Sequence, residues 1–228
     1  SCGSGDSGKI TRVSRIAMGT LVEISVSGSA EKAGHAIEAA FDEIKRIEDL
    51  TSFHKSSGLT ELNNSAGKGP VQPGAELTDL IKRSLEFSDM SGGAFDPTIG
   101  PLAQLWNFSG ESGPRLPELS EIQRVLPLVG WKFMKVDAVQ GLVELTREGM
   151  SVDLGAIAKG YALERASAKL RENGVTSGLI NAGGDIVAFG KKGPDKPWRV
   201  GIQDPRNPSG VIAVAAINDR AVVTSGDY

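Results

Sequence analysis

The segment at residues 151–165 places the tightest limits on how this chain can fold. Apolar residues flank Asp153, and a helical repeat of apolar positions then runs through residues 156–170. This pattern predicts a strand, a tight turn and a helix, in that order. The first turn of such a helix leaves backbone N–H groups unpaired at the positive end of the helix dipole, and both features favour an anionic group such as a phosphate.

The side chains around the predicted turn suit a bound ligand. Gly155, Ala156 and Ala158 are small enough to let a ligand approach the backbone. Asp153 can accept a hydrogen bond from a hydroxyl or a ring N–H, and Lys159 adds a mobile positive charge. An alternative interpretation is a capping Asp and a lysine on a solvated helix face, and the spacing alone leaves both open.

Length and charge narrow the class of protein. A chain of 228 residues with 39% hydrophobic residues can bury a proper core, as one large domain or two small ones. Lys plus Arg number 25 and Asp plus Glu number 28, which gives a net charge of −3, and there is no basic block, so nucleic acid is not an expected partner. No apolar run reaches the ~18 residues of a membrane-spanning helix.

The single cysteine, Cys2, lies in a polar, glycine-rich stretch at residues 1–8 and excludes an internal disulfide. A small residue before a Cys, followed by a flexible tether, is typical of a processed bacterial lipoprotein, in which acylation of the cysteine anchors the protein. We therefore expect a tether at residues 1–10, with a location on the periplasmic side of the inner membrane. An accidental Cys in a disordered tail is the alternative.

The remaining patterns predict an α+β fold with a mostly antiparallel second half. Long amphipathic helices are expected at residues 30–50 and 76–90, the second with Leu77, Leu80, Ile81, Leu85 and Phe87 or its neighbours facing inward. Short helices are expected at residues 59–64, 101–107 and 121–126. Strands are expected at residues 12–16, 21–26, 131–136, 142–146, 198–202, 211–217 and 221–223. Residues 178–190 predict a strand interrupted by Gly183 and Gly184, as a bulge or a close approach to a ligand.

Three loops carry side chains of chemical interest. Met18 lies at the turn between the first two strands, where a thioether can fill a core or pack against a flat ring. Phe53 is an aromatic residue on a loop. Pro97 keeps Asp96 out of the helical region, so Phe95 and Asp96 should stand on a stiff, extended loop, although an ordinary helix-to-loop corner explains them equally well.

The inventory of reactive residues argues against several kinds of site. His35 and His54 form no spaced pair with another His or Cys, so a zinc site is not expected. Neither the Gly-x-Ser-x-Gly elbow nor the Gly-x-Gly-x-x-Gly fingerprint occurs. Carboxylates on glycine-flanked turns do recur, and with a helix N-terminus they would suit Mg²⁺ and a diphosphate, although turns attract Asp in any case. These carboxylates are Asp96, Asp153, Asp185 and Asp227.

Five motifs, taken in order, resemble the ApbE family, the FAD:protein FMN transferases. They are AMGT at 17–20, GAFDPTIGPL at 93–102, VDLGAIAKGY at 152–161, LINAGGD at 179–185 and TSGDY at 224–228. The resemblance implies an α+β fold over residues 11–228, with mostly antiparallel sheets flanked by helices and an FAD cleft between two halves. It also implies Mg²⁺-dependent transfer of FMN from FAD to a threonine or serine of a target protein, with release of AMP.

The resemblance assigns site residues by matching position. The FAD site would be lined by Met18, Phe53, Ala94, Phe95, Asp96, Asp153 and Lys159, and the backbone oxygen of Ala156 would bind Mg²⁺. No catalytic residue is assigned, because family members carry their proposed catalytic histidine and further metal ligands beyond the segment that matches residues 224–228. We therefore expect these 228 residues alone to lack the C-terminal third of the family, to bind Mg²⁺ poorly and to show no transferase activity.

Two other functions remain open. Hydrolysis of FAD to FMN and AMP needs the same site, with water in place of the protein hydroxyl. A lipoprotein that binds FAD without turning it over is the second alternative.

Overall fold

A computed structural model describes residues 10–28, 30–53, 55–107, 113–193 and 195–224. Cys2, His54 and Asp227 lie outside the described residues, as does most of the predicted tether. Ile10, its last residue, already belongs to a strand. The chain divides into two compact units, one made of Ser1–Glu48 with Lys159–Tyr228, the other of Asp49–Ala158. Among the described residues, no helix is both long enough and apolar enough to cross a membrane.

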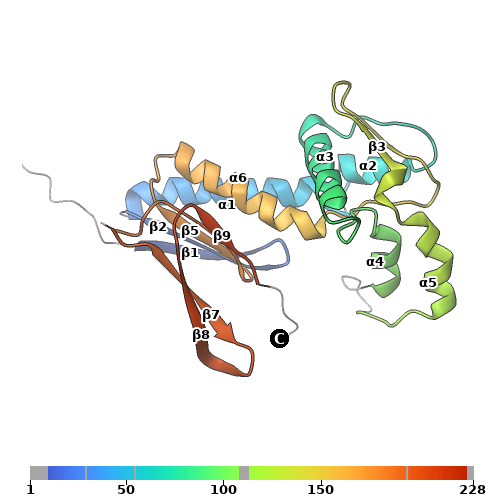
Figure 1. The fold of residues 1–228 in the computed structure, drawn as a ribbon. Coiled ribbons are helices and arrows are strands. Elements are labelled where there is room, and N and C mark those ends of the chain that lie inside the picture. The colour runs from blue at the N-terminus through green and yellow to red at the C-terminus, as the bar shows by residue number, and fades with distance from the viewer. Residues whose placement is uncertain (1–9, 29, 54, 108–112, 194, 225–228) are drawn as a thin grey trace, which may run out of the picture. The chain divides into compact units, whose positions relative to one another are not determined.

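The first unit is built on a five-stranded sheet whose neighbouring strands are all antiparallel (Figure 1). The strand order is β1-β2-β5-β6-β9. The strands are β1 (Ile10–Ala17), β2 (Thr20–Ser27), β5 (Gly178–Ala182), β6 (Asp185–Phe189) and β9 (Arg220–Val222). The expected strands at residues 12–16 and 21–26 are therefore confirmed and are longer than predicted.

Two-residue turns join β1 to β2 and β5 to β6. Met18 and Gly19 have φ of 53° and 70°, and Gly183 and Gly184 have φ of 60° and 97°. Positive φ at both central residues matches the twist of the flanking strands. The expectation of one interrupted strand at residues 178–190 was wrong, because the glycine pair reverses the chain. Gly183 also lies close to the other turn, where an added Cβ would fall 2.4 Å from Thr20 Oγ1.

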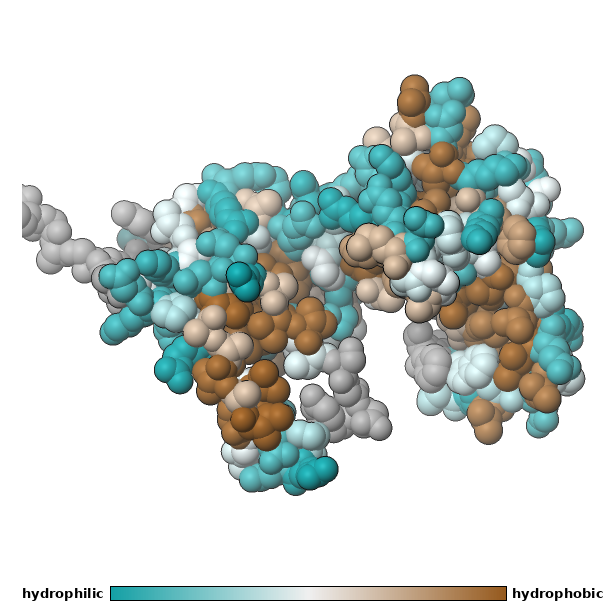
Figure 2. All heavy atoms as spheres, viewed as in Figure 1, coloured by the Kyte–Doolittle hydropathy of each residue, from teal (hydrophilic) through white to brown (hydrophobic). Residues whose placement is uncertain are grey.

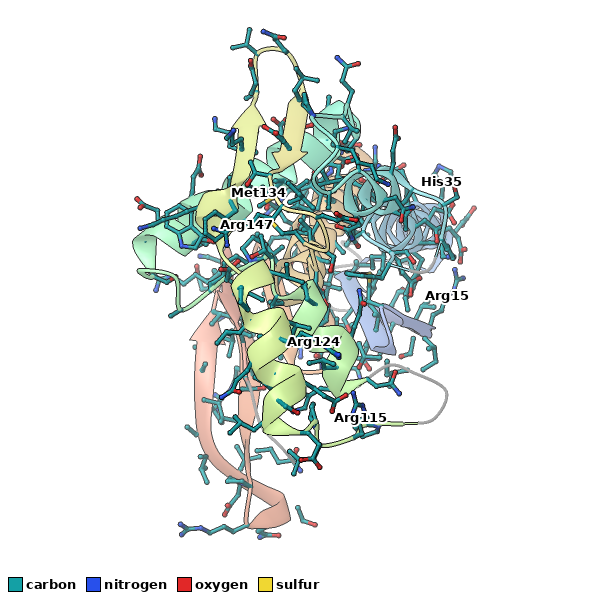
Figure 3. The ribbon with its side chains drawn as sticks, turned by 90° about the vertical axis from the view of Figure 1, so that its right-hand side faces the viewer. Arg15, His35, Arg115, Arg124, Met134 and Arg147 are labelled. Carbon is teal, nitrogen blue, oxygen red and sulfur yellow. The ribbon has the colours of Figure 1, made fainter. Side chains whose placement is uncertain are left out.

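Two long helices cover one face of this sheet. They are α1 (Ala30–Leu50) and α6 (Gly155–Glu172), and both run along the strands in Figure 1. Their apolar side chains share one cluster with those of β2 and β5, including Ile24, Ile37, Ile44, Leu163 and Ile180. The apolar stripe predicted for residues 30–50 is thus confirmed as the core of this unit. Arg15 of β1 stacks over Phe41 of α1 at the edge of that core (Figure 3).

The opposite face of the sheet carries a smaller cluster around Ala188 and Trp198. Trp198 begins β7 (Trp198–Asp204), which forms a hairpin with β8 (Asn207–Ile217). Figure 2 shows apolar side chains gathered over this hairpin. They include Val211, Ile212 and Val214, which are exposed.

The second unit is mainly helical. Its elements are α2 (Gly58–Asn64), α3 (Ala75–Met90), α4 (Gly100–Trp106), α5 (Leu119–Val125), the 3₁₀ turns η1 (Leu126–Leu128) and η2 (Trp131–Phe133), and the hairpin of β3 (Met134–Asp137) and β4 (Leu142–Leu145). The core is formed by buried side chains from these elements, including Leu59, Leu62, Leu77, Ile81 and Leu145. Arg115 precedes α5 and pairs with Glu121 on that helix (Figure 3).

One local expectation for the second unit was wrong, and another is met by a neighbouring residue. Residues 131–133 form a 3₁₀ turn, so the strand expected from residue 131 begins at Met134. The inward-facing position expected at Phe87 or its neighbours is Ser88, which is fully buried, as is Ser84, whereas Phe87 is 45% exposed. Each serine hydroxyl donates to the backbone carbonyl four residues earlier, which removes the cost of burying a hydroxyl.

Candidate functional site

The residues that lead into the turn before α6 do not form a strand. Within the described ranges, Ser151 makes one isolated parallel bridge, to Ile99, although Val152 and Leu154 are buried as a strand would require. The strand predicted from the apolar residues around Asp153 was therefore wrong. The segment runs alongside a loop and a side chain, so no strand ladder can form.

Two partners fix the backbone of this segment. The N–H of Asp153 donates to the carbonyl of Pro97 at 2.8 Å. On Val152, the N–H donates to Asn63 Oδ1 at 2.7 Å and the carbonyl accepts from Asn63 Nδ2 at 3.1 Å. The start of α6 is thus held by the loop that carries Asp96 and by a side chain of α2.

The Asp153 carboxylate is half-buried and caps the helix start. Its Oδ1 accepts from the N–H of Gly155, the first residue of α6, at 2.7 Å. This bond corresponds to the capping alternative. A carboxylate has further acceptor positions, so capping and ligand binding are compatible. Gly155 and Ala156 are exposed, which leaves the first turn of α6 open on one side.

Lys159 lies one turn further along α6 and pairs with Asp185. Lys159 Nζ is 3.0 Å from Asp185 Oδ2, and both residues belong to the first unit. Asp185 begins β6, immediately after the Gly183–Gly184 turn. The sequence singled out Asp185 only as one of several turn carboxylates, because its pairing with Lys159 depends on how the β5–β6 turn meets α6.

The metal prediction rests on Ala156, the second residue of α6. Its backbone carbonyl is a hard oxygen of the kind that Mg²⁺ prefers. Within the described part of the chain, no group of three or more His, Cys, Asp and Glu residues is placed to hold a metal ion.

The loop after α3 presents Ala94 and Phe95. Gly92 and Gly93, with φ of 62° and 87°, turn the chain out of the helix. Ala94 is exposed. The Phe95 ring packs edge to face against the Phe87 ring, with 6.3 Å between the two ring centroids. This contact holds Phe95 half-buried at the surface of the second unit.

Asp96 shapes this loop with both carboxylate oxygens. Oδ1 accepts from the Thr98 N–H at 2.8 Å and from Thr98 Oγ1 at 2.6 Å, while Oδ2 accepts from the Trp131 N–H at 2.9 Å. Thr98 Oγ1 in turn accepts from the N–H of Gly130 at 2.8 Å. Asp96 therefore ties its own loop to residues 130–131. Sequence reasoning missed Thr98, although a Thr two residues after a loop Asp is typical of such turns.

Phe53 lines a groove in the second unit. The groove has a volume of about 620 Å³ and combines apolar walls with a few polar side chains, as ligand sites commonly do. Its lining includes Phe53, Asn63, Leu105, Leu128, Met150 and Ser151. The Ser151 hydroxyl is buried, and no hydrogen-bond partner for it exists among the described residues.

Met18 has an unusual backbone conformation in the first unit. Its φ of 53° lies in the left-handed region, which residues other than Gly, Asn and Asp seldom adopt. Its N–H donates to Glu48 Oε1 at 3.0 Å, and its side chain packs against the α1–α6 core. Strained backbone of this kind clusters at functional sites.

The predicted site residues are divided between the two units. Met18 and Lys159 belong to the first, and the other six belong to the second. Within the second unit, the bond from Asp153 to Pro97 brings the Asp96 loop beside the Asp153 turn. The six are Phe53, Ala94, Phe95, Asp96, Asp153 and Ala156.

A model of the ApbE family matches residues 18–228 of the chain. The chain belongs to the ApbE family. It is 32% identical over 249 residues to the FAD:protein FMN transferase of Treponema pallidum, and 35% identical over 190 residues to one from Klebsiella pneumoniae. The chain spans 68% of the Treponema protein and 58% of the Klebsiella protein, and these alignments cover 100% and 82% of the chain.

Solved ApbE structures share the fold of this family member. The crystal structure of the ApbE protein of Thermotoga maritima matches with a TM-score of 0.90 and 35% identity, covering 96% of this chain and 71% of that one. The apo form of the flavinyl transferase ApbE of Pseudomonas stutzeri matches with a TM-score of 0.81 and 26% identity, covering 97% and 71%. The α+β fold class and the resemblance to the ApbE family are both confirmed.

Proposed function

We propose that the full-length protein transfers FMN from FAD to a threonine or serine of a target protein and releases AMP. The support that carries this proposal is membership of the ApbE family, whose relatives in Treponema pallidum and Klebsiella pneumoniae are named FAD:protein FMN transferases. The open first turn of α6, with Lys159 behind it, is of the type that receives a diphosphate.

In this proposal each site residue has a physical role. The positive end of the α6 dipole and the Lys159 ammonium stabilise the negative charge of the diphosphate. Asp153 and Asp96 accept hydrogen bonds from ribose or ring donors. The flat rings of FAD pack against apolar and aromatic surfaces, to which Met18, Phe53, Ala94 and Phe95 contribute.

The proposed reaction breaks one phosphoanhydride bond. The acceptor hydroxyl attacks the phosphorus on the FMN side and gives up its proton to solvent, a phosphodiester joins FMN to the acceptor, and AMP leaves with the second phosphate. The chain's own contribution is to orient the diphosphate and to offset its charge. We propose that the Ala156 carbonyl helps to hold Mg²⁺, which when bound neutralises phosphate charge.

Mass spectrometry of an acceptor protein tests the proposal. The full-length protein is incubated with FAD, Mg²⁺ and an acceptor that carries a target threonine. We expect flavin that stays on the acceptor after denaturation, in an amount equal to the AMP released. Free FMN and AMP without covalent flavin would instead show an FAD pyrophosphatase, and bound FAD without AMP would show a non-catalytic binding protein.

We also propose that Cys2 carries a lipid anchor that holds the protein on the periplasmic side of the inner membrane. The support is the sequence around Cys2, which lies outside the described residues. Mass spectrometry of the N-terminal peptide from the native host should find an acylated cysteine. An unmodified Cys2 in that peptide would refute the anchor.

A further inference from the structure

The side chain of Asn63 takes the place of a neighbouring strand beside Val152. The two residues are 89 positions apart, yet they exchange two hydrogen bonds, at 2.7 Å to Asn63 Oδ1 and 3.1 Å from Asn63 Nδ2. A primary amide carries a donor and an acceptor in one plane, as a peptide group does. Asn63 therefore satisfies both backbone groups of one residue, as a paired strand would.

Val152 needs such a partner. Its exposed fraction is 0%, and a buried backbone N–H or carbonyl without a partner costs free energy. The segment makes only one isolated bridge to Ile99 on its other side, so no strand ladder supplies these bonds. Removal of the Asn63 amide should leave the segment free to shift.

Asn63 is itself well anchored, because α2 is fixed at several points. Ser57 forms a capping box with Thr60 at the helix start, and Leu59 and Leu62 are fully buried. The amide is therefore held in place before any ligand binds, and its position determines that of Val152.

Val152 immediately precedes Asp153, whose carboxylate caps the first turn of α6. We propose that Asn63 is a positioning residue for the diphosphate site, because it fixes the Asp153 turn and with it the first turn of α6, against which the phosphates bind. This inference rests on the proposed function, since it assumes that FAD binds there.

The test compares FAD with riboflavin, which has the same ring system but no phosphate. The variant Asn63→Leu keeps the size of the side chain and its lack of charge but removes both hydrogen bonds. We expect it to raise the dissociation constant of FAD about tenfold and that of riboflavin less than about twofold. Asn173→Leu is the matched control, because it makes the same substitution at an exposed residue just after α6, at the opposite end of that helix from Asp153.

Flavin fluorescence titrations of the full-length protein with Mg²⁺ give both constants, and urea unfolding of each variant reports the fold. If Asn63→Leu does not unfold cooperatively, Asn63→Gln replaces it, since an added methylene displaces the amide but keeps its polarity. Equal loss of FAD and riboflavin binding, or unchanged FAD binding, would overturn the role of Asn63. Failure of the unmodified protein to bind FAD would instead overturn the proposed function.

Discussion

Lys159 supplies the positive charge behind the first turn of α6. We expect Lys159→Gln to raise the dissociation constant of FAD on the order of tenfold at low salt, because a cation near the diphosphate is lost. Added salt should reduce the difference between the FAD dissociation constants of the variant and the unmodified protein. Lys169→Gln removes the same charge from the same helix, where Lys169 pairs with Glu172 at 2.7 Å. Titration calorimetry measures both variants, and equal losses would exclude a specific role for Lys159.

Glu43 joins α1 to α6 through an ionic network. Only 6% of its side chain is exposed, and it contacts Arg46 at 2.9 Å and Arg165 at 3.1 Å. Its hydrogen bond with Arg46 is the main cause that lowers the pKa of Glu43 to about 2, and the Arg165 hydrogen bond adds to this against the opposing effect of burial. Because the folded pKa lies below the unfolded value, the carboxylate stabilises the fold above about pH 4.5 and loses that effect as the pH falls toward 2.

We therefore expect Glu43→Gln to lower the free energy of unfolding on the order of 2 kcal/mol at pH 7. The difference from the unmodified protein should shrink steadily below pH 4.5. Glu121→Gln is the control, because the pKa of Glu121 is also lowered to about 2, chiefly by its hydrogen bond to Arg115. The Arg115–Glu121 pair is more exposed to solvent than Glu43, so Glu121→Gln should lower the free energy of unfolding by less. Urea unfolding between pH 3 and pH 7 measures these differences. A loss of unfolding free energy in Glu43→Gln that does not change with pH would contradict the prediction.

Among the elements, α4 depends on a close approach at its first residue. A Cβ on Gly100 would fall 2.3 Å from Ser151 Oγ and 2.7 Å from the Ser151 carbonyl oxygen, too close for the backbone to accommodate. Gly100→Ala should thus cost about 2–4 kcal/mol of unfolding free energy.

The same substitution at Gly34, inside α1, is the matched control. An added Cβ there would meet nothing within 4 Å, and Ala favours a helix over Gly by about 1 kcal/mol. Relative to the unmodified protein, the melting temperature should fall in Gly100→Ala and rise in Gly34→Ala. A Gly100→Ala protein as stable as the unmodified one would show that α4 and the Ser151 segment can move apart.

Some elements could be predicted from their own residues, and others depend on partners elsewhere in the chain. The helix expected at residues 30–50 matches α1, because its apolar repeat and polar flanks need no knowledge of the partner. The strand expected before α6 fails for the opposite reason. Apolar residues around Asp153 indicate burial, but a strand also needs a neighbour, and the neighbour is the side chain of Asn63. The pairing of Lys159 with Asp185 likewise depends on tertiary structure.

At the scale of the whole molecule, the motifs predicted the family and the α+β class, because five short segments in a fixed order are specific. Single-residue patterns could not show that Met18 and Lys159 belong to one compact unit and Asp96 and Asp153 to another. That division follows from which segments pair across more than a hundred positions, such as β2 with β5.

Removal of the metal should separate stability from activity in the full-length protein. Because the proposed Mg²⁺ binds mainly through the phosphates of the substrate, we expect EDTA without FAD to leave the melting temperature within about 2 °C of its value in Mg²⁺. Release of AMP from FAD should stop, since the proposed Mg²⁺ binds with the substrate phosphates. Differential scanning fluorimetry and an AMP assay measure the two effects. A large fall in melting temperature would point to a structural metal.

The crystal structure of the full-length protein with FAD and Mg²⁺ tests the central claim most directly. We predict that the diphosphate lies against the first turn of α6 and close to the Lys159 ammonium. A diphosphate bound elsewhere, with Asp153 and Lys159 making no contact to FAD, would contradict the account.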